Sequence, residues 1–364
     1  MNTMAGPATM SGELWSLSRR IKAPQVLVID DFIPGTRSAA RLPRAAELLR
    51  ALAAAGCQIT VLPTRDERIE NTQGHAVLRL RAGDDLGRVM STRNAAFTLI
   101  VVSRPRNLAL VAALAARSRT SIGDALVVYD AERPPTADEL AQARHADVVL
   151  ALEAATAAAY RDAGHADARV LGHAIAPQAP PPFGKRSGFL AVGPTYGDSA
   201  NLAGAVAWFA GHVLPILRAR LGRRATLTVL GAELASAAPL PRTVVPLAAG
   251  TDPGATFDRA RVLVAPREAG DVLPINAFAA AAHGLPAVLT PAQARRIGWN
   301  HGREVLVADT AEEFAAACAA LYTDQLLWEG LRAGARSWVD AACGRGRFDA
   351  MIREVVMQAV TRRR

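Results

Sequence analysis

The sequence predicts an α/β protein that consists of two doubly wound halves. Short apolar runs typical of buried strands alternate with helical segments along most of the chain. A proline-rich stretch without strand or helix pattern, Ala174 to Gly184, interrupts this alternation once. The length of 364 residues is that of two domains. Together these observations predict two parallel sheets, each covered by helices on both faces.

The first half opens with a strand, a helix and a second strand. Gln25 to Asp30 reads QVLVID, an apolar run of the fully buried type. Leu42 to Ala55 carries leucines at helical spacing, and Gly56 ends that helix. Gln58 to Pro63 is then the next strand. This order is a βαβ unit, which pairs its two strands in parallel.

The alternation continues to the end of the first half. The expected elements are strands at Phe97 to Val102, Ala125 to Asp130 and Asp147 to Leu152, and helices at Pro105 to Arg117 and Ala137 to Arg144. We therefore predict an N-terminal extension over residues 1–24, a Rossmann-like domain over residues 25–173 and a linker over residues 174–187.

The second half repeats the pattern, beginning with the strand Gly188 to Gly193. Helices are expected at Asn201 to Arg220, Pro274 to His283 and Ala311 to Tyr322, and strands at Ala225 to Gly231, Arg261 to Pro266, Pro286 to Leu289 and Glu304 to Ala308. The helical stretch Leu326 to Val360 is long enough to cross back onto the first half. This predicts a second Rossmann-like domain over residues 188–340 and a returning C-terminal helix over residues 341–364.

Composition excludes several classes of protein. With 51% hydrophobic and 21% charged residues, the chain is globular rather than disordered. The chain contains no run of roughly 20 uninterrupted apolar residues and no signal-peptide layout in its first 20 residues, so we expect a cytoplasmic protein. Cys57, Cys318 and Cys343 are far apart and form no C-x-x-C pair, which argues against a disulfide framework and a zinc site.

The net charge of +9 favours anionic partners, such as nucleotides, phosphorylated sugars or a membrane surface. The basic residues form no dense tract interleaved with aromatic residues, so nucleic acid is not an expected partner. The terminal sequence Thr361 to Arg364 is too short to anchor the protein, but it could add a weak peripheral contact with anionic lipid.

Doubly wound sheets bind ligands beyond the carboxyl ends of their strands. The loops expected there are Asp31 to Arg41, Gly193 to Ser199, Gly231 to Leu234 and Pro266 to Leu273. The chain has no G-x-G-x-x-G after its first strand and no P-loop, which excludes dinucleotide and P-loop nucleotide binding. Asp30 and Asp31 could bind a metal, but we favour hydrogen bonds to nearby loop amides.

The most informative tract runs from Ala265 to Thr290. It reads as a strand, a glycine-bearing loop, an alanine-rich helix, a glycine stop and a strand. Backbone N–H groups at the start of that helix would face the cleft and could hold a diphosphate through the helix dipole. An ordinary turn without a ligand is the alternative.

Five segments resemble the large family 4 of glycosyltransferases, which have the GT-B fold, use nucleotide-sugar donors and retain the anomeric configuration. Residues 26–63 resemble the opening of one family branch, with its "IP" turn and "G-x-x-V-T-x-x-P" pattern, and residues 146–175 resemble the segment before the interdomain hinge. Residues 189–221 resemble the pattern "FVG…PN…WF…ILP", residues 260–290 the donor-binding segment and residues 303–331 its continuation. The resemblance thus covers nearly the whole chain and implies a GT-B architecture.

The resemblance also implies where the donor binds. It places the nucleotide and diphosphate against loops and a helix start that contain Gly193, Tyr196, Gly231, Glu268, Gly270, Asp271, Val272, Leu273 and Asn276. It implies neither a metal nor a cofactor. The nucleotide-sugar is a co-substrate, and its base is not specified.

Several family side chains are replaced here. Asn276 stands where the family usually has a lysine, and Ala279 where it has the glutamate that holds the donor ribose. A leaving diphosphate develops negative charge that a cation would stabilise. Arg41, which stands where the family has a glycine, and Arg267 could supply it from another direction, or both could be solvated surface residues.

The leading hypothesis is therefore a metal-independent hexosyl-type glycosyltransferase that moves a sugar from a nucleotide-sugar to an acceptor held by the first domain. The acceptor could be a glycan, a lipid-linked glycan or a small molecule. The alternative is a catalytically inactive pseudo-glycosyltransferase that acts as a binding or assembly partner, because its replaced residues are those of the donor site.

Overall fold

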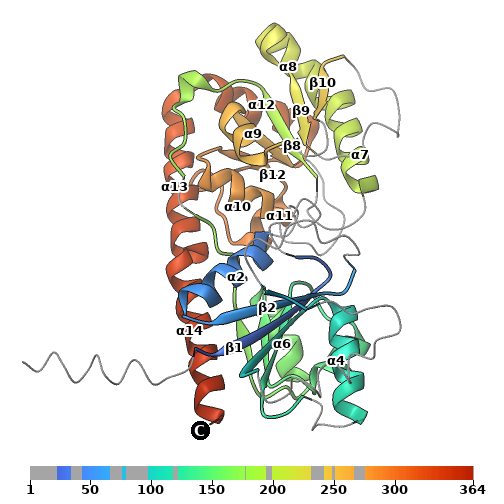
Figure 1. The fold of residues 1–364 in the computed structure, drawn as a ribbon. Helices are drawn as coiled ribbons and strands as arrows, with labels where there is room; N and C mark the ends of the chain where they lie inside the picture. Colours follow the sequence, from blue (N-terminus) through green and yellow to red (C-terminus); the bar gives the residue numbers. More distant parts are fainter. Residues whose placement is uncertain are drawn as a thin grey trace, which may run out of the picture.

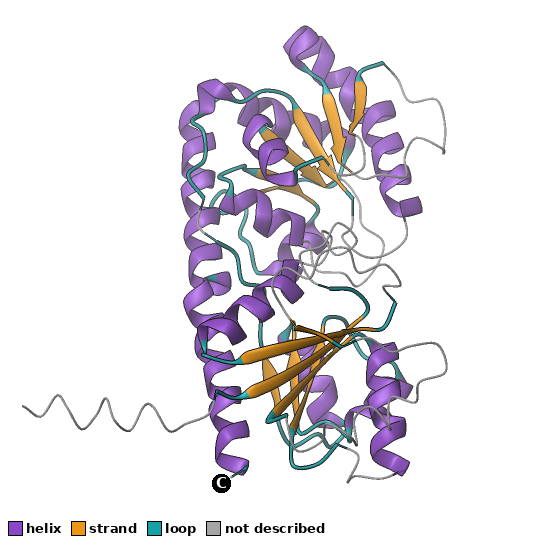
Figure 2. Ribbon diagram, in the orientation of Figure 1, coloured by secondary structure: helices purple, strands orange, loops and turns teal. Residues whose placement is uncertain are grey.

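The computed structural model describes residues 23–33, 43–65, 76–78, 97–117, 122–176, 178–193, 199–230, 242–247, 251–265 and 275–363. These residues form two parallel sheets, one in each half, and helices cover both faces of each sheet (Figure 1, Figure 2). The predicted fold class, two doubly wound halves, is confirmed.

The first sheet has seven parallel strands in the order β3-β2-β1-β4-β5-β6-β7. They are β1 (Gln25–Asp30), β2 (Gln58–Pro63), β3 (Ala76–Val77), β4 (Leu99–Ser103), β5 (Leu126–Ala131), β6 (Val148–Ala151) and β7 (Ala168–Val170). The strand order reverses between β1 and β4, and a crevice for ligands forms at such a point, beyond the carboxyl ends of the strands.

Two separate apolar cores cover the faces of this sheet. On one face, β1 contributes Val26 and Val28, and α2 (Pro43–Ala54) and α14 (Arg345–Arg362) pack against them. On the other face, Leu27 and Ile29 contact the core that contains residues of α4 (Pro105–Arg117), α5 (Ala137–Ala143) and α6 (Ala154–Asp162). Alternate residues of one strand thus serve both cores, because the side chains of a strand point to opposite faces in turn.

The second sheet has six parallel strands in the order β10-β9-β8-β11-β12-β13. They are β8 (Phe189–Val192), β9 (Leu227–Leu230), β10 (Val244–Leu247), β11 (Val262–Ala265), β12 (Ala287–Leu289) and β13 (Leu306–Val307). The order reverses between β8 and β11. Both sheets therefore follow the strand order of dinucleotide-binding folds, although neither half carries the glycine fingerprint of that class.

Helices cover both faces of the second sheet. One face bears α7 (Ser199–Trp208), α8 (Leu214–Leu221) and α12 (Ala311–Thr323), and the other bears α9 (Pro253–Arg259), α10 (Ile275–Ala282) and α11 (Pro291–Ile297). The long helix α13 (Gln325–Cys343) contributes residues to both cores. Between α7 and α8 lies a π-helical turn, Phe209–Val213, in which the N–H of Leu214 donates to the carbonyl of Phe209. Pro215 has no N–H to donate to the carbonyl four residues earlier, which accounts for the altered turn.

By length and composition alone, the helical stretch Leu202–Arg224 is long and apolar enough to cross a membrane. We did not expect such a stretch from the sequence. It is the one such stretch among the described residues. Phe209, Val213 and Leu217 from this stretch are buried against Phe189 and Leu227 of the second sheet. The core of the second half therefore accounts for its apolar composition.

The chain crosses between the two halves twice, near Ile175 and near Gly344, and these two crossings lie side by side. The N–H of Ile175 donates to the carbonyl of Cys343 at 2.8 Å, and Ile175 and Gly344 form a β-bridge. The long C-terminal helix expected from the sequence is broken at Gly344, which has φ −64° and ψ 139°. A Cβ atom at this position would lie 2.5 Å from the carbonyl oxygen of Asp340, so the sharp break requires glycine.

After this break, α14 runs along the first half, as Figure 1 shows, and ion pairs join it to that half. Arg50 and Glu47 of α2 pair with Asp349 and Arg345 of α14. At the end of α14, Arg362 lies 2.7 Å from Asp147 and Arg363 donates to the hydroxyl of Thr98 at 3.2 Å. Two of the three terminal arginines considered for a lipid contact thus bind residues of the chain itself.

Candidate functional site

Two residues of the predicted donor site meet at the point where the strand order of the second sheet reverses. Gly193 directly follows β8, and Asn276 lies in the first turn of α10, the helix after β11. The side-chain amide of Asn276 donates to the carbonyl oxygen of Gly193 at 2.6 Å. The residue that stands in place of the family's lysine therefore fastens Gly193, the residue after β8, to the first turn of α10. Sequence reasoning placed both residues at the donor but did not foresee this bond.

Ala279 lies about one turn further along α10 and is partly buried against the apolar core behind the sheet. The inner face of the helix buries Ala277, Phe278, Ala280 and Ala281 in that core. Ala279 has no polar side-chain atom, so it cannot accept a hydrogen bond from a ribose hydroxyl. The replacement expected from the sequence is thus placed on the helix that the donor would contact.

The remaining predicted site residues lie outside the described part of the chain. These are Arg41, Tyr196, Gly231, Arg267, Glu268, Gly270, Asp271, Val272 and Leu273. Whether Arg41 or Arg267 supplies a cation to the donor therefore lies outside the described residues as well. Their roles stay predictions from the family resemblance.

A second polar group stands at the carboxyl edge of the first sheet. Asp30, Ser103 and Asp130 lie at or near the ends of the adjacent strands β1, β4 and β5, and their alternation places them on the face toward α2 and α14. All three residues are almost fully buried. The N–H of Asp31 donates to Oδ1 of Asp30 at 2.6 Å, which is the interaction with a loop amide that the sequence favoured.

The sequence analysis did not identify Arg104, which contacts two carboxylates at this edge of the sheet. Arg104 has φ +78°, and it is the one non-glycine residue with positive φ among the described residues. Its guanidinium donates to Oδ1 of Asp30 at 3.2 Å and to Oε2 of Glu132 at 2.7 Å. Burial raises the pKa values of the Asp30 and Glu132 carboxyls above their ordinary values, and the charge of Arg104 opposes both shifts.

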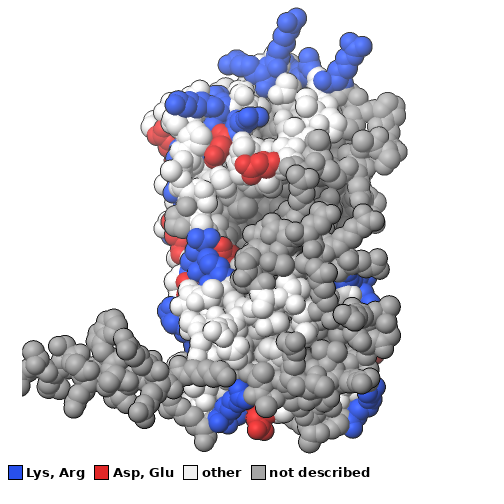
Figure 3. All heavy atoms as spheres, viewed as in Figure 1, with Lys and Arg blue, Asp and Glu red and all other residues white. Residues whose placement is uncertain are grey.

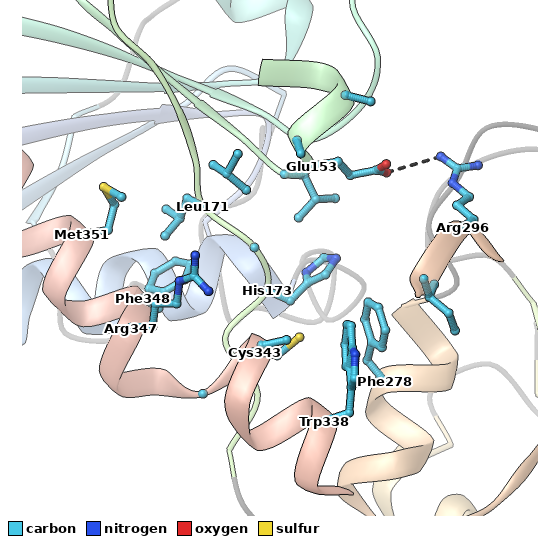
Figure 4. A pocket seen from close by; sticks show the side chains of 18 residues that line it. Glu153, Leu171, His173, Phe278, Arg296, Trp338, Cys343, Arg347, Phe348 and Met351 are labelled. Atoms are coloured by element: carbon cyan, nitrogen blue, oxygen red, sulfur yellow. Dashed lines mark hydrogen bonds and ion pairs between the residues drawn. The ribbon is translucent and has the colours of Figure 1, made fainter. Parts of the chain in front are cut away.

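A cavity of about 470 Å³ lies between the two halves beside the crossings (Figure 4). Its walls include His173 and Leu171 from the first crossing, Phe278 from α10, and Trp338 and Cys343 from α13. At its edge, Arg296 of α11 donates to a carboxylate oxygen of Glu153 at 3.3 Å, an ion pair that joins the two halves. The cavity is mainly apolar, and it was not predicted from the sequence.

His173 lies in this wall and makes the fold sensitive to acid. Burial, assisted by the nearby charge of Arg44, lowers the pKa of its imidazole from 6.5 to about 3. The unfolded chain therefore binds a proton at this residue between pH 6.5 and pH 3 that the folded chain does not bind. Its stabilising effect is complete above pH 6.5 and is lost as the pH falls toward 3.

Replacing His173 with leucine is expected to make stability less dependent on pH. The wild-type free energy of unfolding should fall between pH 6.5 and pH 4 by up to about 1.4 kcal/mol per pH unit more than that of the variant, since one proton is involved. Urea unfolding at a series of pH values measures the difference. The exposed His212→Gln variant is the control for losing an imidazole elsewhere, and equal slopes for His173→Leu and wild type would contradict the expectation.

One group of basic side chains lies away from the interface of the halves. Figure 3 shows a group of Lys and Arg side chains at the end of the second half that is remote from the first half. Arg218, Arg220, Arg223 and Arg224, at the end of α8 and in the turn that follows, are exposed. Cations near a helix C-terminus complement the helix dipole, so this group has a structural reason for its position.

Comparison with solved structures shows that the chain has the GT-B fold of glycosyltransferases. HepE from Anabaena, in complex with UDP-glucose, is 15% identical, with a TM-score of 0.67 over 92% of this chain and 99% of its own. Sucrose-phosphate synthase from Thermosynechococcus elongatus is 15% identical, with a TM-score of 0.63 over 93% and 99%. A glycosyltransferase from Rickettsia africae is 10% identical, with a TM-score of 0.65 over 93% and 99%.

A segment of the second half also matches a protein family. Residues 195–324 match the family "Glycosyl transferases group 1". No curated protein sequence matches the chain. The resemblance to GT-B glycosyltransferases that the sequence indicated is therefore confirmed, and family 4 is consistent with these findings.

Proposed function

We propose that the chain is a hexosyl-type glycosyltransferase that takes its sugar from a nucleotide-sugar and transfers it to an acceptor hydroxyl. The observation that supports this most directly is the contact between Asn276 and Gly193, because it assembles the donor side of the cleft at the point where the strand order of the second sheet reverses. Asn276 lies within the segment that matches the family of glycosyl transferases group 1. HepE, which shares the fold, was solved with UDP-glucose.

In this proposal the donor diphosphate binds at the start of α10. The N–H groups of the first helical turn have no partners within the helix, and the helix dipole favours an anion there. Gly193, which Asn276 holds in place, forms part of the adjacent wall. Arg41 and Arg267 are proposed as the cations that compensate for the missing lysine, and Glu268 to Leu273 as the remaining backbone contacts.

The proposed reaction exchanges one bond at the anomeric carbon for another. The bond from C1 of the sugar to the diphosphate oxygen breaks, and C1 bonds to the acceptor oxygen on the same face, with retention of configuration. The acceptor proton leaves with the nucleoside diphosphate. We propose that no metal ion and no further cofactor take part, and that the protein acts in the cytoplasm.

A nucleotide screen tests the proposal. Calorimetry and thermal-shift assays would measure binding of UDP, GDP, ADP and their common sugars, with an Asp271→Ala, Asn276→Ala double variant as the control. We expect one nucleotide to bind to the wild type and to lose affinity in the double variant. No binding at millimolar concentration would overturn the transferase proposal and favour the binding-partner alternative.

Two further measurements address the finer parts of the proposal. Turnover should be unchanged when EDTA is added, and loss of turnover that Mg²⁺ or Mn²⁺ restores would contradict metal independence. The NMR coupling constant of the anomeric proton in donor and product should report the same configuration, and an inverted product would contradict retention.

The Asn276→Ala variant alone is expected to weaken nucleotide binding about two- to tenfold. The reason is that a neutral hydrogen bond contributes about 0.5 to 1.5 kcal/mol, and its loss releases Gly193 from α10. Calorimetric titration with the nucleotide found in the screen measures the change. Asn300→Ala, at an exposed position of the same half, is the matched control, and equal affinities for both variants would exclude a role for the Asn276 contact.

A further inference from the structure

We propose that the cavity between the two halves binds a small organic acid, a carboxylate attached to an apolar body. This cavity, shown in Figure 4, has a volume of about 470 Å³, and small-molecule sites usually have about 300 to 1,000 Å³. The residues that line it include neither Gly193 and Asn276 of the proposed donor site nor the buried group of Asp30, Ser103 and Asp130. The site is therefore distinct from both polar groups described above.

The walls of the cavity are mainly apolar and come from both halves. Large apolar side chains line it from the crossing near residue 175, from α14 and from the second half: Leu171, Phe278, Ile297, Trp338, Phe348 and Met351. A nucleotide or a free sugar does not suit such walls, because its phosphates or hydroxyls would lose water without gaining hydrogen bonds. The walls therefore favour a ligand whose body is a hydrocarbon chain or an aromatic ring.

Arg347 places a positive charge beside these walls. It lies near the start of α14, lines the cavity and is exposed, so it stands where the cavity meets the solvent. It has no hydrogen-bond or ion-pair partner among the described residues. A guanidinium binds a carboxylate through two parallel hydrogen bonds. A ligand can thus keep its carboxylate at Arg347, near water, while its apolar body fills the cavity.

The other charges near the cavity are already paired. Arg296 pairs with Glu153, and Arg44, whose charge acts on His173, pairs with Asp130. Glu153 is the one carboxylate among the described residues that line the cavity. Arg347 is therefore the charge that a ligand would meet, and it attracts an anion and repels a cation.

His173 adds a neutral polar group inside the cavity. Its imidazole points into the cavity in Figure 4 and has no hydrogen-bond partner among the residues that the structure describes. Because burial lowers the pKa of this imidazole to about 3, the ring is neutral near pH 7, with one nitrogen that donates and one that accepts. It can therefore donate to an oxygen of the ligand without adding a second charge to the apolar cavity.

A ligand in this cavity would contact both halves. Phe278 and Trp338 belong to the second half, and Leu171 and His173 to the first crossing. Binding would therefore stabilise the arrangement of the halves seen here over arrangements in which these walls are apart. The N–H of Ile175, which donates to the carbonyl of Cys343 beside the cavity, should then exchange its hydrogen more slowly.

Calorimetry on the full chain tests the proposal with octanoate and 2-naphthoate as probes. The two acids share the carboxylate and differ in the body, so the tighter one shows whether the cavity prefers an acyl chain or an aromatic ring. We expect at least one acid to bind, and the alcohol with the same body to bind about fivefold more weakly, the upper part of the range for an exposed ion pair. Hydrogen exchange followed by mass spectrometry should show slower exchange over residues 171–176 when the acid is bound.

Two variants separate the charge from the apolar walls. Arg347→Gln should weaken binding of the acid about fivefold and leave binding of the alcohol unchanged. Ala342→Leu, in the wall formed by α13, should weaken binding of both by filling the cavity. Arg353→Gln is the matched control, because Arg353 is an exposed arginine of the same helix that does not line the cavity. Ala155→Leu, at an exposed position of the lining, replaces Ala342→Leu if melting shows that the latter does not fold.

Three results would overturn the proposal. They are the absence of binding by either acid, equal binding of acid by Arg347→Gln and Arg353→Gln, and binding that leaves hydrogen exchange over residues 171–176 unchanged. Equal affinities for an acid and its alcohol would likewise exclude a carboxylate site. No nucleotide takes part in these measurements, so they can fail while the nucleotide screen succeeds, and the reverse.

Discussion

Alanine at Gly334 is expected to lower the free energy of unfolding of the second half by about 2 kcal/mol or more, because overpacking a close backbone contact costs about 1 to 3 kcal/mol and occasionally more. Gly334 lies in the middle of α13. A Cβ atom there would lie 2.0 Å from the carbonyl oxygen of Arg303 and 3.0 Å from its carbonyl carbon. Both are backbone atoms, so a side-chain rotation cannot relieve the clash.

Gly330 provides a control within the same helix. A Cβ atom at Gly330 would meet nothing within 4 Å. Alanine at that position should therefore raise stability by roughly 0.5 to 1 kcal/mol, the usual gain for replacing glycine inside a helix. Urea denaturation followed by circular dichroism measures both variants. If both glycines respond alike, the close approach of α13 to residue 303 is wrong.

The Gly334 contact also bears on the proposed donor site. The loop after α11 carries Trp299, whose ring lies 6.0 Å from that of Trp338 in α13 and 5.9 Å from that of Phe278 in α10. The Phe278 and Trp338 rings stack at 5.3 Å. Pushing α13 away from the loop would disturb this cluster, and α10 carries Asn276. We therefore expect Gly334→Ala to weaken nucleotide binding, whereas Gly330→Ala should not.

The central strands could be predicted because parallel strands buried on both faces are continuous apolar runs. β1 and β2 have the bounds that the sequence indicated, residues 25–30 and 58–63. The short strands β3, β7 and β10 were not predicted. All three lie at sheet edges, β3 and β7 have only two and three residues, and β10 contains Pro246, which weakens any strand pattern.

The helix interruptions depend on local contacts that periodicity does not record. The expected helices over residues 201–220 and 326–360 are broken by a π-helical turn before Pro215 and by the extended backbone of Gly344. Pro215 and Gly344 are visible in the sequence as residues that could disturb a helix. Their consequences still depend on the packing around them, so the apolar periodicity alone predicted uninterrupted helices.

The two polar sites differ in how far the sequence could reveal them. Gly193 and Asn276 both follow strands that border the same crevice, and the family resemblance selected them. Arg104 joins Asp30 and Glu132, which are 74 and 28 residues away in the chain. No motif spacing marks such contacts. Only the pairing of β4 with β1 and β5 brings these residues together.

The Arg44→Met variant is expected to lose about 3 to 5 kcal/mol of stability, because removing one partner leaves the other charge buried and unpaired. Arg44 and Asp130 are 3% and 1% exposed, and Nη2 of Arg44 lies 2.6 Å from Oδ1 of Asp130. Nη1 of Arg44 also donates to the carbonyl oxygens of Leu171 and Gly172 at 2.7 and 2.6 Å. The variant would thus loosen the segment that leads into the crossing between the halves.

A double-mutant cycle with Asp130→Asn separates the ion pair from the carbonyl contacts. Asp130→Asn removes the buried negative charge, so the double variant should be more stable than Arg44→Met alone, with a coupling between the sites of at least about 1 kcal/mol. The stability that the double variant still lacks relative to the wild type measures the contacts of Arg44 to Leu171 and Gly172, which methionine cannot replace. If the losses in free energy of unfolding of the two single variants simply add in the double variant, Arg44 acts through those carbonyls and its pairing with Asp130 contributes little.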